Sequence, residues 1–110
     1  MDAPSFPAMP WFEPTLSLTI DRLRALLPKL KREFPLRRMS LFGSVARGEA
    51  APGSDVDILV DVDPSIGLRF VTLAERLETE LGRKVDLVSR RALKPGLWAQ
   101  IEPELIDVET

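Results

Sequence analysis

The sequence predicts an α/β (α+β) domain, built on a mixed β-sheet of about four strands flanked by helices. Two long segments, residues 15–34 and 66–81, repeat apolar residues at the spacing of one helix face. Short strand-like runs rich in Val, Ile and Leu alternate with these segments. The second helical segment has the length of a crossover connection, so the strands on either side of it are expected to run parallel.

Chain length and proline content divide the sequence into two regions. We expect a Pro-rich N-terminal arm at residues 1–14 and a single domain at residues 15–110, because 110 residues suffice for one hydrophobic core but not for two. The prolines of the arm disfavour both helix and central strand. Trp11 and Phe12 are costly to leave in water, so we expect them to dock on the domain or on a partner.

Composition and charge exclude several classes of function. The net charge of −2 and the pI of about 5.2 give no bulk basic field for nucleic acid or an anionic membrane. Cysteine and histidine are both absent, which excludes disulfides, a Ser-His-Asp triad and a zinc site of nitrogen and sulfur ligands. A bound metal would therefore have oxygen ligands, as magnesium, manganese and calcium prefer. Without a membrane-length apolar run or a signal peptide, a cytoplasmic location is expected.

Two helices are predicted from periodicity and from their end signals. In residues 15–34 the apolar face consists of Leu16, Ile20, Leu23, Leu27, Leu30 and Phe34. Pro28 falls inside this pattern, so we expect a kink or a break into two short helices. The helix at residues 66–81 is expected to be capped by Ser65 and closed by Gly82.

The strands are expected at residues 37–42, 55–62 and 84–88, with a short fourth strand at residues 105–108. Between the last two strands, Pro95 suits the first turn of a helix. That helix carries apolar residues at helical spacing, Leu97, Trp98 and Ile101. We expect Trp98 to belong to the core rather than to form a platform for adenine.

The polar residues that interrupt these strands are predicted to converge. In the second strand, Val56, Ile58, Val60 and Val62 point one way, and Asp55, Asp57, Leu59 and Asp61 point the other way. Ser44 lies where the first strand ends and Asp55 where the second begins, so the two points meet only if these strands are antiparallel neighbours. Asp57 and Asp86 are each the third residue of strands expected to be parallel, so they could lie at one level. We interpret Asp61, farther along, as the solvated end of its strand.

This set of residues suits nucleotide chemistry. Carboxylates at i and i+2 on a strand share a face and can hold one or two hard cations, and Asp86 would complete the cage. Two metals can bind a nucleoside triphosphate, activate an attacking hydroxyl and neutralise the leaving pyrophosphate. We expect Gly43-Ser44 to turn into a short helical segment that ends near Gly48. Gly43 lets a phosphate approach the backbone, Ser44 adds a hydroxyl, and the amides that open this segment can donate to phosphate oxygens.

Other phosphate and metal motifs do not fit the sequence. Gly43 and Gly48 have the spacing of a P-loop, but Glu49 and Ala50 stand where Lys and Ser or Thr are required. Gly-x-Gly-x-x-Gly does not occur, so a dinucleotide fold has no support. The acidic residues lie on apolar strands rather than within one calcium-binding loop.

The motif resembles a known family. Residues 41–48 (Leu-Phe-Gly-Ser-Val-Ala-Arg-Gly) and 54–60 (Ser-Asp-Val-Asp-Ile-Leu-Val), with Asp86 on a later strand, resemble the minimal nucleotidyltransferase (MNT) proteins of the polymerase-β-type superfamily. The resemblance covers about residues 16–108 and implies the nucleotidyltransferase fold. Many MNT proteins are antitoxins paired with HEPN-domain ribonuclease toxins. The resemblance therefore implies transfer of AMP from ATP to a toxin hydroxyl, typically a tyrosine.

The same resemblance implies a role for each motif residue. Asp55 and Asp57 would coordinate two Mg²⁺ ions (or Mn²⁺). Asp86 would bind the catalytic metal and help to deprotonate the acceptor hydroxyl. Gly43 and Ser44 would hold the terminal phosphates. Arg47 either reaches a phosphate or faces solvent. For Asp55 a turn cap, and for Asp86 an ordinary solvent-facing strand residue, are the structural alternatives.

The chain has no residues left for an acceptor-binding domain, so a HEPN toxin is expected to bring the acceptor hydroxyl and to form a hetero-oligomer with it. Two other hypotheses stay open. The chain could neutralise a toxin by contact alone, without catalysis. It could also act on a small molecule or an RNA end, although the acidic pI weighs against this substrate class.

Overall fold

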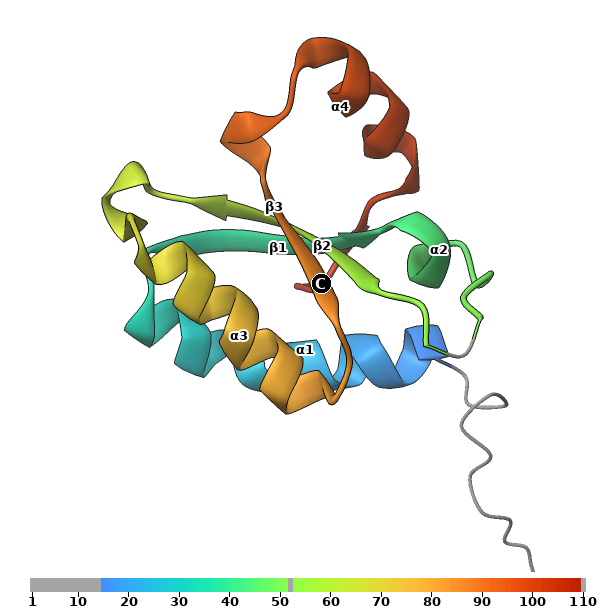
Figure 1. Cartoon of the computed structure of the whole chain (residues 1–110), viewed down its shortest axis with the longest axis horizontal. Helices are drawn as coiled ribbons and strands as arrows, with labels where there is room; N and C mark the ends of the chain where they lie inside the picture. Colours follow the sequence, from blue (N-terminus) through green and yellow to red (C-terminus); the bar gives the residue numbers. More distant parts are fainter. Residues whose placement is uncertain (1–14, 52, 110) are drawn as a thin grey trace, which may run out of the picture.

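The computed structural model describes residues 15–51 and 53–109 and shows a four-stranded mixed sheet with helices on both faces (Figure 1). The helices are α1 (Thr15–Glu33), α2 (Gly43–Ala46), α3 (Arg69–Leu81) and α4 (Pro95–Ile101). The strands are β1 (Leu36–Phe42), β2 (Val56–Val62), β3 (Val85–Ser89) and β4 (Ile106–Asp107). Single 3₁₀ turns are η2 (Pro64–Ile66), η3 (Arg90–Ala92) and η4 (Glu102–Glu104).

The strand order is β3-β2-β1-β4, and the pairings confirm the predicted mixed sheet. β1 is antiparallel to both β2 and β4, whereas β2 and β3 are parallel across the α3 crossover. The C-terminal end of β1 therefore lies beside the N-terminal end of β2. The parallel β3 begins at that same edge, so three strand ends meet there.

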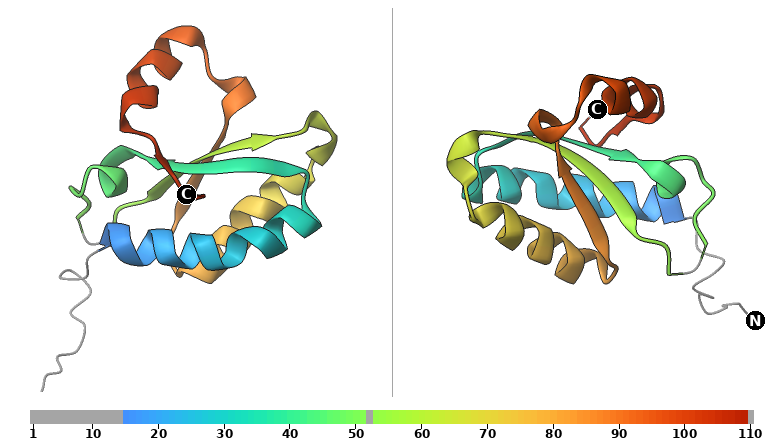
Figure 2. Two further views of the ribbon diagram at one scale, coloured as in Figure 1. Left: turned by 180° about the vertical axis from the view of Figure 1, so that it is seen from behind. Right: turned by 45° about the horizontal axis from the view of Figure 1, so that its top comes forward.

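The core lies between the sheet and the helices α1 and α3, which cover one face together (Figure 2). Alternate residues of β2 point into it, as predicted, and Val56, Ile58 and Val60 are fully buried. From the helices, Leu23, Leu30, Leu73 and Leu77 are fully buried against them. The opposite face of the sheet is left to polar residues and to α4, which stands over part of it (Figure 1). The site residues lie on this second face.

Two expectations about the helices, at Pro28 and at Ser65, are corrected by the structure. The break at Pro28 is wrong, because α1 runs unbroken from Thr15 to Glu33. Pro28 faces solvent while Leu27 and Leu30 stay buried, so packing holds both halves in one helix and water can reach the carbonyl that the ring leaves unpaired. Ser65 is not a cap either. Its amide donates to the carboxylate of Asp63 (2.9 Å) in η2, and α3 begins only after that turn.

Other expectations are confirmed or fall outside the described residues. Gly82 ends α3 in the left-handed region, with φ of 65°, as predicted. β2 begins at Val56, so Asp55 directly precedes the strand instead of opening it. The arm at residues 1–14, with Trp11 and Phe12, lies outside the described residues. Within the described ranges, no helix has the length and apolar character that crossing a membrane requires.

The packing of α3 predicts a sharp contrast between two leucines. Leu73 is fully buried against the sheet, whereas Leu68 is 90% exposed. Leu73→Ala is expected to lower the free energy of unfolding by about 2–5 kcal/mol, because it leaves a cavity in the core. Leu68→Ala should change it by less than about 0.5 kcal/mol. Urea unfolding of both variants measures the contrast, and equal effects would contradict this placement of α3.

Candidate functional site

The parallel pairing of β2 with β3 brings two of the predicted carboxylates together. Asp57 and Asp86 are register partners, so both side chains leave the sheet on the same face, opposite the core. Asp57 is half-buried and Asp86 is exposed. The prediction that Asp57 and Asp86 lie at one level of neighbouring parallel strands is therefore confirmed. The third strand is Val85–Ser89 instead of residues 84–88.

The Gly-Ser turn packs directly against the central carboxylate. Phe42, the last residue of β1, is the register partner of Asp57, so Gly43 follows at the level of this side chain. A Cβ on Gly43 would collide with Oδ2 of Asp57 and lie 2.9 Å from its Cγ. Gly43 also has φ of 76°, in the left-handed region. Both constraints require glycine here, and the half-buried Ser44 follows it in the first turn of α2.

The carboxylate cluster carries uncompensated negative charge. Burial raises the pKa of Asp57, and the charges of Asp86 and Asp55 and a hydrogen bond with Asp86 raise it further. Arg47 lowers this pKa only in part. The structure thus gathers like charges where a cation would relieve their repulsion, and all of their ligand atoms are oxygens. This donor set fits a hard divalent cation.

Asp55 lies outside the paired strands that hold the other two carboxylates. It is exposed and lies just before β2. In the described part of the chain, no three acidic side chains stand close enough to hold an ion as they are placed. Asp57 and Asp86 are therefore the assembled pair, and Asp55 would have to turn toward them to complete a metal cage.

A glutamate that the sequence did not single out occupies the Gly43 turn. The amide of Gly43 donates to Oε1 of Glu104 (3.0 Å), and Nη1 of Arg47 donates to both carboxylate oxygens of Glu104 (3.0 and 3.1 Å). Arg47 also donates from Nε to Glu49 (2.9 Å). These two acids raise the pKa of the Arg47 guanidinium, the bond to Glu49 most strongly. Arg47 is thus exposed, as one of the two alternatives expected, and its guanidinium is ion-paired with Glu49 and Glu104.

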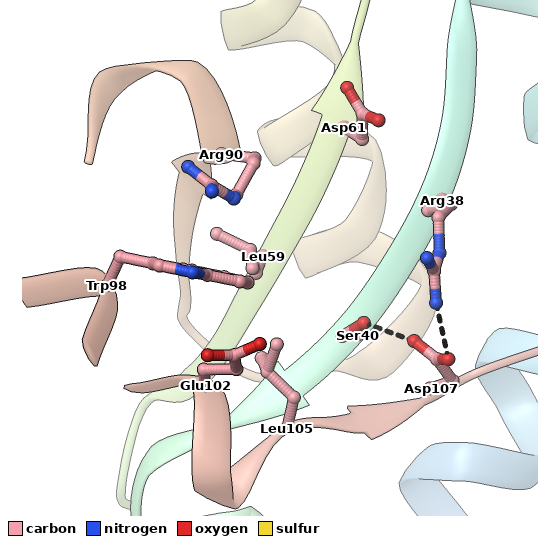
Figure 3. Close-up of a pocket in the computed structure, with 9 residues that line it drawn as sticks. All are labelled: Arg38, Ser40, Leu59, Asp61, Arg90, Trp98, Glu102, Leu105 and Asp107. Atoms are coloured by element: carbon pink, nitrogen blue, oxygen red, sulfur yellow. Dashed lines mark hydrogen bonds and ion pairs between the residues drawn. The ribbon is translucent and has the colours of Figure 1, made fainter. Parts of the chain in front are cut away.

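Beside the carboxylates, the same sheet face holds a cavity of about 330 Å³ under α4, here called the open-face pocket (Figure 3). It is lined by Arg38, Ser40, Leu59, Asp61, Arg90, Trp98, Glu102, Leu105 and Asp107. The guanidinium carbon of Arg90 lies 3.8 Å from the ring centroid of Trp98. The expectation that Trp98 is a core residue is wrong, because α4 stands off the sheet and its inner side borders this pocket. Asp61, predicted at a solvated strand end, is half-buried in the pocket wall.

The chain matches the family model described as "Nucleotidyltransferase domain" over residues 23–108. It is 42% identical over 97 residues to the protein adenylyltransferase MntA of Thermococcus cleftensis, an alignment that covers 83% of this chain and 97% of the relative. These matches confirm the resemblance stated from the Gly-Ser and Asp-Val-Asp motifs.

Solved structures with the same fold agree. A crystal structure of a toxin-antitoxin with AMP-PNP superposes with a TM-score of 0.65 at 30% identity, covering 77% of this chain and 71% of that chain. A complex of a tri-AMPylated Shewanella oneidensis HEPN toxin with an MNT antitoxin gives 0.61 at 25% identity, covering 84% and 71%. The chain belongs to the nucleotidyltransferase domain family and is a relative of the MntA protein adenylyltransferases.

Proposed function

We propose that this chain is an antitoxin-type nucleotidyltransferase that transfers AMP from ATP to a hydroxyl, a tyrosine in the first instance, of a partner HEPN toxin. The observation that carries the proposal is the in-register pair of Asp57 and Asp86 packed against the Gly43 turn. It is supported by the named activity of the MntA relative and by the AMP-PNP and AMPylated HEPN toxin in the related complexes.

In the proposed reaction, the acceptor hydroxyl oxygen attacks the α-phosphorus of ATP. The bond from the α-phosphorus to the oxygen bridging to the β-phosphate breaks, and pyrophosphate leaves with that electron pair. Asp86, the more exposed of the paired carboxylates, would take the hydroxyl proton. Gly43 and Ser44 would hold the phosphates that leave. The product is an AMP ester of the acceptor hydroxyl.

The metal ligands in this proposal are Asp57 and Asp86, with Asp55 turning in to join them. Bound Mg²⁺ or Mn²⁺ would neutralise the triphosphate and support ionisation of the acceptor. The raised pKa of Asp57 shows that its ionised form is disfavoured without a cation. Metal and nucleotide are therefore expected to bind cooperatively, since each supplies charge that the other needs.

Glu104 competes with the nucleotide in this proposal. Its carboxylate accepts from the Gly43 amide and from Arg47, and a phosphate oxygen would use both of these donors. Glu104 must therefore release them when the triphosphate binds. Because breaking the contacts of Glu104 with Gly43 and Arg47 costs free energy, nucleotide affinity is lowered by that amount.

The transfer itself is tested with labelled ATP, Mg²⁺ and a HEPN partner. Wild-type protein should label the partner, and Asp57→Asn should lower the rate by about 100-fold or more, the scale for removing one electrostatic group from an active site. Asp21→Asn, an exposed aspartate of α1 on the other side of the sheet, is the matched control and should keep full activity.

The stability of Asp57→Asn shows whether lost activity reflects lost fold. Because its pKa is raised in the folded protein, ionised Asp57 destabilises the free chain, and stability rises as the pH falls through that pKa. Asp57→Asn should therefore melt at the same or a higher temperature than wild type. Unaltered label transfer by this folded variant would sink the proposal. If the folded variant instead loses label transfer and still protects cells from the toxin, neutralisation by contact is the correct function.

Nucleotide binding tests the competition by Glu104. Glu104→Gln keeps the side-chain shape but removes the charge, so affinity for AMP-PNP with Mg²⁺ should rise about three- to tenfold in isothermal titration calorimetry. Glu109→Gln, which removes a surface charge paired with Lys31, should leave it unchanged. Weaker binding by Glu104→Gln would instead show that Glu104 supports the bound state.

A further inference from the structure

The connection between α3 and β3 contacts the backbone on both sides of Asp55. Nη2 of Arg83 donates to the carbonyl oxygen of Ser54 (2.6 Å) in a partly buried hydrogen bond. The carbonyl oxygen of Lys84 accepts from the amide of Val56 (2.9 Å). Asp55 itself is exposed and lies directly before β2. The two neighbours of this acid are therefore held by a segment that is distant in sequence.

These two hydrogen bonds restrain the backbone dihedral angles of Asp55. The Ser54 carbonyl belongs to the peptide plane before Asp55, and the Val56 amide belongs to the plane after it. Because each peptide unit is planar, only φ and ψ of Asp55 lie between the two held planes. The bond to Val56 comes from the backbone, whereas the bond to Ser54 comes from the side chain of Arg83. A substitution at Arg83 can therefore release one of the two planes.

The backbone of Asp55 matters because the carboxylate site lacks a third ligand as it stands. Among the residues that the structure describes, no three acidic side chains are close enough to hold an ion, so Asp55 would have to turn toward Asp57 and Asp86. Residues two apart on an extended chain share a face and are separated by about 7 Å. With its backbone held in line with β2, Asp55 needs only side-chain rotation to approach Asp57. A backbone free to swing would have to be ordered as well, which would lower cation affinity.

The end of α3 also holds the strand that carries the facing acid. The amide of Val85, the residue before Asp86, donates to Oε2 of Glu78 on α3 (3.0 Å). Backbone groups next to both Asp55 and Asp86 are thus held by the last turn of α3 and the connection that follows it. This part of the chain therefore sets how the two acids are placed relative to each other.

We infer that Arg83 is a positioning residue that presents Asp55 to a cation held by Asp57 and Asp86. The inference rests on the proposed function, because it names the residue that prepares the third ligand of that site. In this role Arg83 touches neither the cation nor the nucleotide and acts through the Ser54 carbonyl. A positive charge near a cation site by itself weakens cation binding. Removing Arg83 therefore has opposite effects if it acts by position and if it acts by charge.

The test measures the affinity of the protein for Mn²⁺ in the presence of AMP-PNP, with protein-bound Mn²⁺ followed by the enhancement of water proton relaxation. Arg83→Gln, which removes the charged donor, should weaken Mn²⁺ binding about five- to tenfold, near the lower end of the effect of removing a group that orients a metal ligand. Arg83→Lys keeps a charged donor on a shorter stem and should lose only about two- to threefold. Lys84→Gln is the matched control and should bind as wild type does. It removes the same charge from an exposed side chain of the same connection and keeps the backbone bond to Val56.

A double-mutant cycle with Asp55→Asn separates positioning from a general effect on the fold. Asp55→Asn alone should weaken Mn²⁺ binding, and adding Arg83→Gln to it should change the affinity by less than about twofold, because the ligand that Arg83 positions is already lost. The melting temperature of each variant, measured without metal, shows whether it is folded. If Arg83→Gln does not fold, the same cycle is carried out with Arg83→Lys, with the smaller loss expected only where Asp55 is present.

Three results would overturn the inference. Unchanged or stronger Mn²⁺ binding by folded Arg83→Gln would mean that Arg83 acts by charge or not at all. An equal loss with and without Asp55→Asn would mean that Arg83 does not act through Asp55, and wild-type affinity of Asp55→Asn would mean that Asp55 is no ligand. All three leave the proposed function standing if Asp57→Asn weakens Mn²⁺ binding. If Asp57→Asn binds Mn²⁺ as wild type does, or wild type binds none, the proposed function fails and the inference falls with it.

Discussion

The site depends on one close contact, that of the Gly43 backbone with the carboxylate of Asp57, which has Asp86 beside it on the next strand. The contact exists only because β1 is antiparallel to β2 while β3 is parallel to it. Reversing either pairing would move the turn or one carboxylate to the opposite end of the sheet. The mixed topology is thus what gathers the Gly43 turn and the carboxylates of Asp57 and Asp86 at one end of the sheet.

The close grouping of carboxylates around Asp57 lowers the stability of the folded chain. Asp57 is half-buried among like charges, which raise its pKa, and the Glu104 carboxylate occupies Arg47 and the Gly43 amide. The core on the other face, with Leu23, Leu30, Leu73 and Leu77 fully buried, supplies the stability that tolerates this strain. The two faces therefore differ: one holds the buried core, and the other carries the carboxylates of Asp57 and Asp86 and the Gly43 turn.

The strand pairing that brings Asp57 and Asp86 together could be predicted from sequence, whereas the contacts of Glu104 and the position of Trp98 could not. The period of two in residues 55–62 placed Asp57 opposite the core, and the crossover length of α3 implied a parallel neighbour that carries Asp86. Glu104 reaches Gly43 across 61 residues, and no local pattern separates it from Glu102, the other glutamate of η4. Trp98 has helical spacing typical of a core residue, but the distance of α4 from the sheet is set by tertiary packing. Tertiary packing also explains why the helix does not break at Pro28, since the neighbouring Leu27 and Leu30 are buried.

We propose that Asp57 and Asp86 act as one cation site that the bound nucleotide completes. The most direct measurement is a titration of the protein with Mn²⁺ in the presence and absence of AMP-PNP, with free Mn²⁺ followed by electron paramagnetic resonance. AMP-PNP is expected to strengthen Mn²⁺ binding. Asp86→Asn is expected to weaken the Mn²⁺ affinity of the ternary complex by about tenfold or more. Mn²⁺ binding by Asp86→Asn that equals wild type, with AMP-PNP bound, would contradict it.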